Sequence, residues 1–491
     1  NKLFIARDRA GKKPFYYFFD HKKFLFASEL NCLKTMVPLE IERENFFAYL
    51  RLGSFYRQFT PYKNVTELRA GSFLIVDCNS LSVNETRWWN INDFYQKVNK
   101  DSFEECLHHT DILLHQSVKR RLESSDLEVG SFLSGGIDSG LVTAIASEYN
   151  NNLKTFTVSF AGEYDEAPLA KLVADKHKTH HTEIKISFNN LKEDLEKILY
   201  NYGEPFFDSS IIPSYYVSQE AKKLVTVILN GDGADELFGG YRRYVPFAKY
   251  DFFKKNFLVQ KGASFFRKNL PQANNKKSLY NYLYRLASFA SNSDLEIYLS
   301  AGVDIFEEYQ QYIINPGFDY LEPVKRDFDK IADSNLSGLK KIMNLDFDTV
   351  LFSDFLVKMD IATMANSQEG RSSFLSKELL EYVPTLPDQY KIKGKTTKYL
   401  LRQLAIKYLP EELIHQPKRG FEIPLKNWIE NELKEPVFDY LSTTNNFYKN
   451  FVQQNFVHDL LKKKIKISDE KRAKILWTLL SLEIWYKKVY Q

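Results

Sequence analysis

The sequence contains few of the residues that would signal a disulfide framework or a metal cluster. Cysteine occurs three times in 491 residues, at scattered positions. Three separated cysteines build neither a disulfide scaffold nor a cysteine zinc site, so a reducing compartment and a cytoplasmic location are expected. No apolar run approaches the roughly 18 to 20 residues that cross a bilayer, and no secretory signal opens the chain, so no membrane partner is predicted.

Neither sign of charge is in clear excess. Lys and Arg number 67 and Asp and Glu 63, which leaves a net charge of +4. This balance argues against a nucleic-acid partner. Hydrophobic residues make up 44% and charged residues 26%, which excludes wholesale disorder and is ordinary for a globular protein of two or three domains.

Two kinds of hydrophobic pattern divide the chain. Residues 1–95 contain short apolar runs separated by turn-forming groups, which predicts a β-rich domain. Residues 96–104 are polar and are predicted to form a linker. In residues 105–491, strand-like apolar runs first alternate with stretches whose apolar residues recur at helical spacing. From about residue 245 the pattern is mainly helical.

The alternating part of the second region predicts a parallel, doubly wound α/β sheet covered by helices on both faces. The predicted strands are 127–133, 153–160, 182–186 and 224–229, and the predicted helices between them are 140–149 and 166–178. A final helix is predicted over 475–486.

The strongest chemical signal is the segment SGGIDS, which lies directly between a predicted strand and a helix. The adjacent Gly135 and Gly136 let the backbone approach a ligand without a Cβ clash. The helix start that follows offers unpaired N–H groups and the positive end of a dipole, which favour phosphate. The hydroxyls of Ser134 and Ser139 add donors, and Asp138 is suited to hold Mg²⁺ against the phosphates.

A second signal, the segment NGDGADE over residues 230–236, follows the strand predicted at 224–229. Its three carboxylates, Asp232, Asp235 and Glu236, suit Mg²⁺ and close contact with a nucleotide, although such a segment alone could be a solvated acidic turn. Ligands of open α/β sheets bind at the carboxyl ends of strands. Because both segments follow strands of one predicted sheet, we expect them to form one site.

Five segments, in this order, resemble the glutamine-hydrolysing asparagine synthetase family: SGGIDS, GDGADELFGGY, KMDIATMANSQEGR, GKTTKYLLR and PKRGFEIPLKNW. Upstream, LFIARDRAGKKPFYY, FLFASELNCL and ELRAGSFLIV are similar to the second half of that family's glutaminase domain. The resemblance implies a doubly wound, PP-loop ATP pyrophosphatase (adenine nucleotide α-hydrolase-like) domain with C-terminal helices. A partial β-rich glutaminase domain of the Ntn type, α+β in class, would precede it.

The activity that the resemblance implies is ATP-dependent amide synthesis with Mg²⁺. Aspartate would be adenylated on its side-chain carboxylate with release of pyrophosphate, and ammonia, normally from glutamine, would displace AMP to give asparagine. A carboxylate needs this activation because it is anionic and has no good leaving group. The resemblance is also compatible with a homodimer.

The resemblance implies roles for individual residues. Asp232 would take part in forming the acyl-adenylate, Lys398 would stabilise phosphate charge, and Glu369 would position or deprotonate the amine. Asp138 and Asp235 would be the metal ligands. ATP and pyrophosphate would be bound by Leu133, Ser134, Gly135, Gly136, Asp138, Ser139, Val158, Asn230 and Gly231.

The region around the acceptor substrate departs from the family pattern. Ile361 stands where the family usually has arginine, Asn230 where it has serine, and residues 371–376 lack its usual proline and aspartate. A relative that amidates another carboxylate, such as a sugar acid for surface polysaccharide, or closes an amide ring therefore stays open. A non-catalytic, nucleotide-binding partner subunit is a further alternative.

Three other residues permit more than one interpretation. Lys358 is either on a helix surface or in the site. Lys418 and Arg419 are either a solvated pair or, since Lys-Arg-Gly-Phe matches a family motif, part of the active site. The family's glutaminase uses an N-terminal cysteine whose α-amino group serves as base, and this chain opens with Asn1. We therefore expect the natural protein to extend further, and the chain as given to use ammonia but not glutamine.

Overall fold

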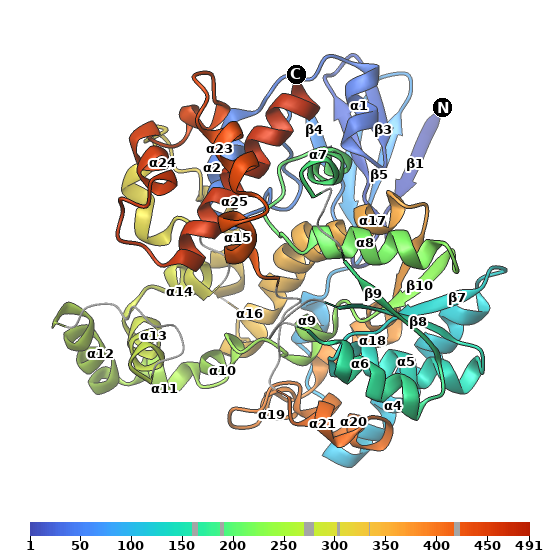
Figure 1. The fold of residues 1–491 in the computed structure, drawn as a ribbon. Coiled ribbons are helices and arrows are strands. Elements are labelled where there is room, and N and C mark those ends of the chain that lie inside the picture. Colours follow the sequence, from blue (N-terminus) through green and yellow to red (C-terminus); the bar gives the residue numbers. More distant parts are fainter. Residues whose placement is uncertain (160–164, 187–190, 270–278, 302–304, 333, 417–422) are drawn as a thin grey trace.

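The computed structural model describes residues 1–159, 165–186, 191–269, 279–301, 305–332, 334–416 and 423–491 (Figure 1). Its centre is a five-stranded sheet in the order β11-β10-β7-β8-β9, and every neighbouring pair is parallel. This confirms the predicted parallel sheet. Its strands are β7 (Val129–Phe132), β8 (Lys154–Ser159), β9 (His180–Lys185), β10 (Val227–Asn230) and β11 (Glu369–Ser372).

Helices cover both faces of this sheet, as a doubly wound fold requires. On one face α5 (Ile137–Tyr149) packs on β7 and β10, and α6 (Ala167–Lys176) packs on β8 and β9. On the other, α8 (Ile211–Lys222) contacts β8, and α17 (Val357–Met364) contacts both β11 and α8. Figure 1 shows these two layers with the sheet between them.

Strand β11 was absent from the prediction. Its residues, Glu-Gly-Arg-Ser, carry no apolar or β-branched run, so neither periodicity nor propensity marks them. The Glu369 N–H donates to the carbonyl of Thr226 at 2.9 Å, and parallel pairing then runs from Val227 opposite Glu369 to Asn230 opposite Ser372. Tertiary pairing with the buried β10 therefore determines this strand.

The N-terminal region is β-rich, as predicted. It contains two three-stranded antiparallel sheets, ordered β1-β5-β6 and β3-β2-β4. The elements are β1 (Lys2–Ala6), β2 (Tyr16–Phe19), β3 (Phe24–Ala27), α1 (Leu30–Met36), α2 (Arg43–Leu52), β4 (Val65–Glu67), β5 (Ser72–Asp77), β6 (Val83–Arg87) and α3 (Asn92–Tyr95). The alternating exposure of β5 directs Leu74 and Val76 into a small core between the strands.

Helix α4 (Phe103–Glu123) begins where the polar segment ends. Ser102 caps it: the Ser102 side chain accepts from the Glu105 N–H, and the Glu105 carboxylate accepts from the Ser102 N–H at 2.8 Å. This reciprocal capping box satisfies two N–H groups that the first turn would otherwise leave unpaired.

The helical remainder of the chain lies beside the sheet and the N-terminal strands, and part of it projects to one side of the molecule (Figure 1). Within the described residues, no helix is both long and apolar enough to cross a bilayer. The other elements are α7 (Leu191–Tyr202), α9 (Ala234–Phe238), α10 (Tyr244–Phe247), α11 (Tyr250–Lys255), α12 (Phe257–Asn269), α13 (Leu279–Ser291), α14 (Asp294–Ala301), η1 (Glu307–Tyr312), α15 (Glu322–Ala332), α16 (Gly338–Asp346), η2 (Phe347–Leu356), η3 (Ser373–Leu375), α18 (Lys377–Tyr382), η4 (Val383–Thr385), α19 (Asp388–Lys391), α20 (Tyr399–Tyr408), α21 (Glu411–Ile414), α22 (Leu425–Glu430), α23 (Lys434–Leu441), η5 (Phe447–Asn450), α24 (Gln454–Leu461), α25 (Asp469–Trp485) and η6 (Tyr486–Tyr490).

The N-terminal region is joined to the rest of the chain by apolar packing and by ion pairs. Phe46 of α2 lies 5.2 Å from the Trp485 ring of α25 and 5.4 Å from Phe451, so both ends of the chain share one hydrophobic core. An ion pair adds to this contact. Arg87 donates to both oxygens of Asp348, at 2.9 and 3.0 Å.

Candidate active site

The SGGIDS segment forms a compact turn between β7 and α5. The Ser134 N–H donates to Ser139 Oγ at 3.0 Å, and the two serine hydroxyls share a hydrogen bond of 2.9 Å. The Gly136 N–H donates to Ser134 Oγ at 3.2 Å. Gly136 opens α5 without a side-chain cap, so the first turn of the helix keeps the anion-binding character expected of it.

The NGDGADE segment turns sharply between β10 and α9. Gly233 has a φ of +87°, which side-chain-bearing residues rarely adopt, and glycine permits this turn. A Cβ on Gly231 would lie 3.1 Å from Asp138 Cβ and 3.1 Å from the Ser139 nitrogen. The two segments that we expected to form one site are therefore in direct contact.

Lys398 joins these two segments. Its Nζ lies 2.5 Å from Asp138 Oδ2 and 2.5 Å from Asp235 Oδ1, and its side chain is 2% exposed. It comes from the start of α20, where its φ of +51° is left-handed. The structure thus brings together three predicted site residues that are far apart in the sequence.

Two carboxylates around one ammonium leave the cluster with an excess negative charge. Asp138 Oδ1 is buried and has no hydrogen-bond partner among the described residues. A buried carboxylate oxygen without a partner is costly, and a hard cation would satisfy it. The described residues contain no group of three or more His, Cys, Asp or Glu able to hold a metal, so any such cation would take its remaining ligands from substrate and water.

Gly240 provides the space in which this cluster fits. A Cβ at this position would overlap Asp235 Oδ1 and press against Lys398 Cε. We expect Gly240→Ala to displace the ion pair and to raise KM for ATP about tenfold or more, because the geometry of the predicted ATP site would be lost. Steady-state kinetics against ATP measures this effect.

Gly262→Ala is the matched control, since a Cβ on Gly262 in α12 meets nothing within 4 Å. We expect this control to leave KM for ATP unchanged. A Gly240→Ala protein with parental kinetics would contradict the inferred role of the Asp235–Lys398 pair.

Glu236 does not join the acidic cluster, which corrects the expectation that all three carboxylates of its segment face the ligand. Its side chain is buried, and the Tyr241 hydroxyl donates to Glu236 Oε1 at 2.5 Å. Burial and the neighbouring Asp235 carboxylate raise the pKa of Glu236 to about 7. The α-helical turn of α9 directs this side chain into the interior, while Asp235 faces Lys398.

The residues predicted to contact adenosine lie on neighbouring strands. Leu133 directly follows β7, and its N–H donates to the carbonyl of Phe156 in β8 at 2.8 Å. Val158 lies near the end of β8, and both side chains are buried. Asn230, at the end of β10, is also buried, and its side-chain Oδ1 accepts weakly from the Asp232 N–H at 3.4 Å.

Glu369 lies apart from the phosphate-binding segments. It opens β11, opposite Val227, whereas the other predicted residues of this sheet lie at or just beyond the carboxyl ends of strands. Arg371 Nε and Nη2 donate to its carboxylate at 2.9 and 3.3 Å. Burial acts to raise its pKa, but Arg371, with Lys13 and Lys12, outweighs burial and lowers it. Glu369 is therefore an ionised, anchored carboxylate.

Lys358 is buried, so its interpretation as a helix-surface residue is wrong. Its Nζ donates to Asp208 Oδ2 at 2.7 Å, and its side chain is 11% exposed. Lys418 and Arg419 lie outside the described residues.

Sequence reasoning missed Lys12 and Lys13, which lie in a loop before β2 and face the C-terminal region. Nothing in the sequence of a β-rich segment indicates that a lysine contacts another part of the fold.

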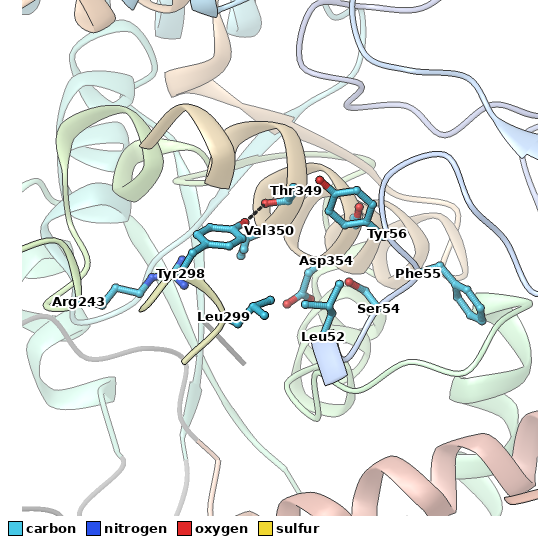
Figure 2. Close-up of a pocket in the computed structure, with 11 residues that line it drawn as sticks. Leu52, Ser54, Phe55, Tyr56, Arg243, Tyr298, Leu299, Thr349, Val350 and Asp354 are labelled. Atoms are coloured by element: carbon cyan, nitrogen blue, oxygen red, sulfur yellow. Dashed lines mark hydrogen bonds between the residues drawn. The ribbon is translucent and has the colours of Figure 1, made fainter. Parts of the chain in front are cut away.

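A small cavity lies beside Asp354, between the end of α2 and η2 (Figure 2). Its volume is about 50 Å³, enough for one or two water molecules. Tyr298 and Thr349 share a hydrogen bond of 2.7 Å on one wall. Leu52 and Ser54 come from the N-terminal region, so the cavity marks the junction of the two parts of the chain.

The pKa of Asp354 is raised to about 8 by burial and by the nearby Asp208 carboxylate. The folded chain therefore holds a proton there that the unfolded chain releases near pH 4, and stability should fall as pH rises from about 4 to about 8. The amide side chain introduced by Asp354→Asn cannot ionise. We expect the free energy of unfolding of this variant, relative to the parent, to increase by at least about 1 kcal/mol between pH 5 and pH 8. Urea unfolding at both pH values tests this, and parallel pH curves would contradict it.

Comparison with known proteins agrees with this geometry. The asparagine synthase family model matches residues 109–487, and a glutamine amidotransferase domain model matches residues 1–89. The chain is 31% identical to asparagine synthetase [glutamine-hydrolyzing] 1 of Bacillus subtilis, over 99% of this chain and 75% of that protein. It is 33% identical to a putative asparagine synthetase of Methanocaldococcus jannaschii, over 74% of this chain and 69% of the relative.

A putative asparagine synthetase of Mycobacterium bovis is 30% identical, over 99% of this chain and 74% of that protein. The match runs through both the N-terminal strands and the sheet that carries the Asp138–Lys398–Asp235 cluster. The chain belongs to the asparagine synthase family of carbon–nitrogen ligases, whose PP-loop ATP pyrophosphatase-type domain is here preceded by a glutamine amidotransferase domain.

Proposed function

We propose that the chain adenylates the side-chain carboxylate of aspartate with ATP and then transfers ammonia to give asparagine. A carboxylate oxygen attacks the α-phosphorus of ATP, and the bond to the β-phosphate oxygen breaks as pyrophosphate leaves. Ammonia then attacks the acyl carbon, loses a proton to a base, and AMP departs. Glutamine is the proposed natural source of the ammonia, through a glutaminase domain of which residues 1–95 are a part. Residues 105–491 form the synthetase domain after a linker at 96–104.

The observation that supports this proposal most is the meeting of the SGGIDS and NGDGADE turns around Lys398. Lys398 is buried between Asp138 and Asp235. There its positive charge can stabilise the negative charge that develops on the phosphates as pyrophosphate leaves. Ser134, Gly135, Gly136 and Ser139 are proposed to bind the pyrophosphate through hydroxyl and N–H groups.

The donor set fits Mg²⁺. Asp138 and Asp235 supply carboxylate oxygens, the ligand type that this ion prefers, and Asp138 Oδ1 has no hydrogen-bond partner among the described residues. Bound there, Mg²⁺ would neutralise phosphate charge. Asp232, at the carboxyl end of β10, is proposed to act in forming the acyl-adenylate, and Glu369 to position or deprotonate the amine.

A product assay tests the proposal. The purified chain is mixed with ATP, MgCl₂, ammonium chloride and aspartate, and AMP, pyrophosphate and asparagine are measured. We expect the three products in equal amounts. Ammonium makes the result independent of glutamine hydrolysis. Formation of AMP with a different acid alone would refute aspartate as the acceptor, and no AMP with any acid would refute the reaction.

A further inference from the structure

A loop of the N-terminal region carries two adjacent lysines onto the synthetase domain. The Asp8 carboxylate fixes this loop by accepting from the backbone N–H groups of Lys12 at 3.0 Å and Lys13 at 3.2 Å. Lys13 Nζ donates to Asp360 Oδ1 of α17 at 2.6 Å. The loop is therefore held on both sides, and Lys12 is placed beside the segments that carry Asp232 and Glu369, whose charges interact with it.

Lys12 differs from Lys13 in its partners. It is partly buried, and across the described ranges its ammonium makes no hydrogen bond or ion pair. A cation withdrawn from water without an anion beside it is unfavourable. Burial and the positive charges of Arg121 and Lys13 lower the pKa of Lys12 to about 7, whereas Asp232 and Asp8 act in the opposite direction.

Arg121, in the last turn of α4, is the second cation of this kind. Its guanidinium donates to the carbonyl and hydroxyl oxygens of Ser117, at 3.1 and 2.7 Å, and it has no carboxylate partner in the described part of the chain. Arg371 donates to the Arg121 carbonyl at 2.7 Å and also binds Glu369, so the end of α4 is fixed against β11. The charge of Arg121 acts on Lys12, so the two cations lie near each other, and neither pairs with a carboxylate among the described residues.

We propose that Lys12 and Arg121 form an anion subsite that binds the second acidic group of the acceptor, the group that is not adenylated. This rests on the proposed function. The phosphates already have Lys398 and the SGGIDS turn, so the two cations are available to the acid. A dicarboxylic acid would direct one carboxylate toward ATP near Asp232 and the other toward Lys12 and Arg121. The N-terminal domain would then select the acceptor of the synthetase domain.

Calorimetric titration tests this subsite without requiring turnover. The full chain is loaded with Mg²⁺ and α,β-methylene-ATP and titrated with L-aspartate or with isoasparagine, in which an amide replaces the α-carboxylate. We expect Lys12→Met and Arg121→Met each to weaken aspartate binding about tenfold to a hundredfold, since each removes a hydrogen bond to a charged group. We expect the parent to bind isoasparagine as weakly as the variants bind aspartate.

Two further variants complete the design. Lys12→Arg keeps the positive charge and should restore binding to within about threefold of the parent. Arg120→Met is the matched control, because Arg120 is exposed on the same helix and pairs with Glu378, at 3.0 Å. It should bind aspartate as the parent does.

Several results would overturn the subsite. The first is a parent protein that binds aspartate and isoasparagine equally well. The second is a pair of variants that lose affinity for the nucleotide instead of for aspartate. The third is a parent protein that binds no dicarboxylic acid. By contrast, Lys12-dependent aspartate binding without any formation of AMP would refute the proposed reaction and leave the subsite standing.

Discussion

Lys398→Met should lower kcat for AMP formation by about 10²- to 10³-fold, the usual cost of removing one preorganised charge from a site where negative charge develops. The structural reason is specific: Lys398 Nζ is 2.5 Å from carboxylates on α5 and α9 and is almost fully buried. Without it, Asp138 and Asp235 repel each other next to the phosphates. Rapid-quench measurement of AMP formation at saturating ATP and aspartate gives the size of the effect.

Lys395→Met provides the control for this experiment, because Lys395 lies on the exposed turn just before α20. It should keep parental kcat. Lys398→Met must also be shown to fold, by circular dichroism and a cooperative thermal transition. A folded Lys398→Met protein with kcat within about threefold of the parent would remove the main support for the proposed phosphate site.

Asp348→Asn should have the largest effect on stability, a loss of about 3 to 5 kcal/mol in the free energy of unfolding. Asp348 of η2 accepts both hydrogen bonds of Arg87 and lies 3.7 Å from Arg57, and all three side chains are at least three-quarters buried. The substitution removes the anion and leaves two cations in a poorly hydrated junction. Denaturant unfolding at pH 7 measures the loss.

The pH dependence of this effect has a definite sign. Burial alone would raise the pKa of Asp348, but the guanidinium groups of Arg87 and Arg57 outweigh burial and lower it. A carboxyl group with a lowered folded-state pKa stabilises above its ordinary pKa near 4 and loses that contribution as pH falls. The parent and Asp348→Asn should therefore converge in stability as pH is lowered from 5 toward 3.

Asp175→Asn is the matched substitution at an exposed pair. Asp175 pairs with Lys171 one helical turn away, and both side chains are 62% exposed. A pair so open to solvent contributes less than about 1 kcal/mol. Equal losses for Asp348→Asn and Asp175→Asn would contradict the view that the Arg87–Asp348 junction holds the two domains together.

The meeting of the two turns that form the proposed phosphate site could be predicted from the sequence because the signals are local. Glycines and serines at the ends of apolar strands indicate the turns of residues 134–139 and 230–235, and the parallel sheet brings strand ends together. Lys398 was reached only through the family resemblance. No local pattern links it to Asp138, 260 positions away along the chain.

The acceptor half could not be predicted in the same way. Strand β11 has no β-type sequence and depends on pairing with β10. Lys12 and Arg121 belong to different domains, and only the folded structure shows that neither has a carboxylate partner in the part of the chain that it describes. The orientation of Glu236 could not be predicted from the sequence either. The single turn of α9 determines whether Asp235 or Glu236 faces Lys398.

The contact between Phe46 and Trp485 has a consequence for how the polypeptide is made. The ring that completes the packing around Phe46 lies 439 positions downstream, so it leaves the ribosome long after Phe46 does. Closing so long a loop is slow, and apolar surface on the early strands stays exposed meanwhile. Biosynthesis of this enzyme should therefore depend on chaperones that protect the nascent N-terminal segment until the segment that carries Trp485 has been synthesised.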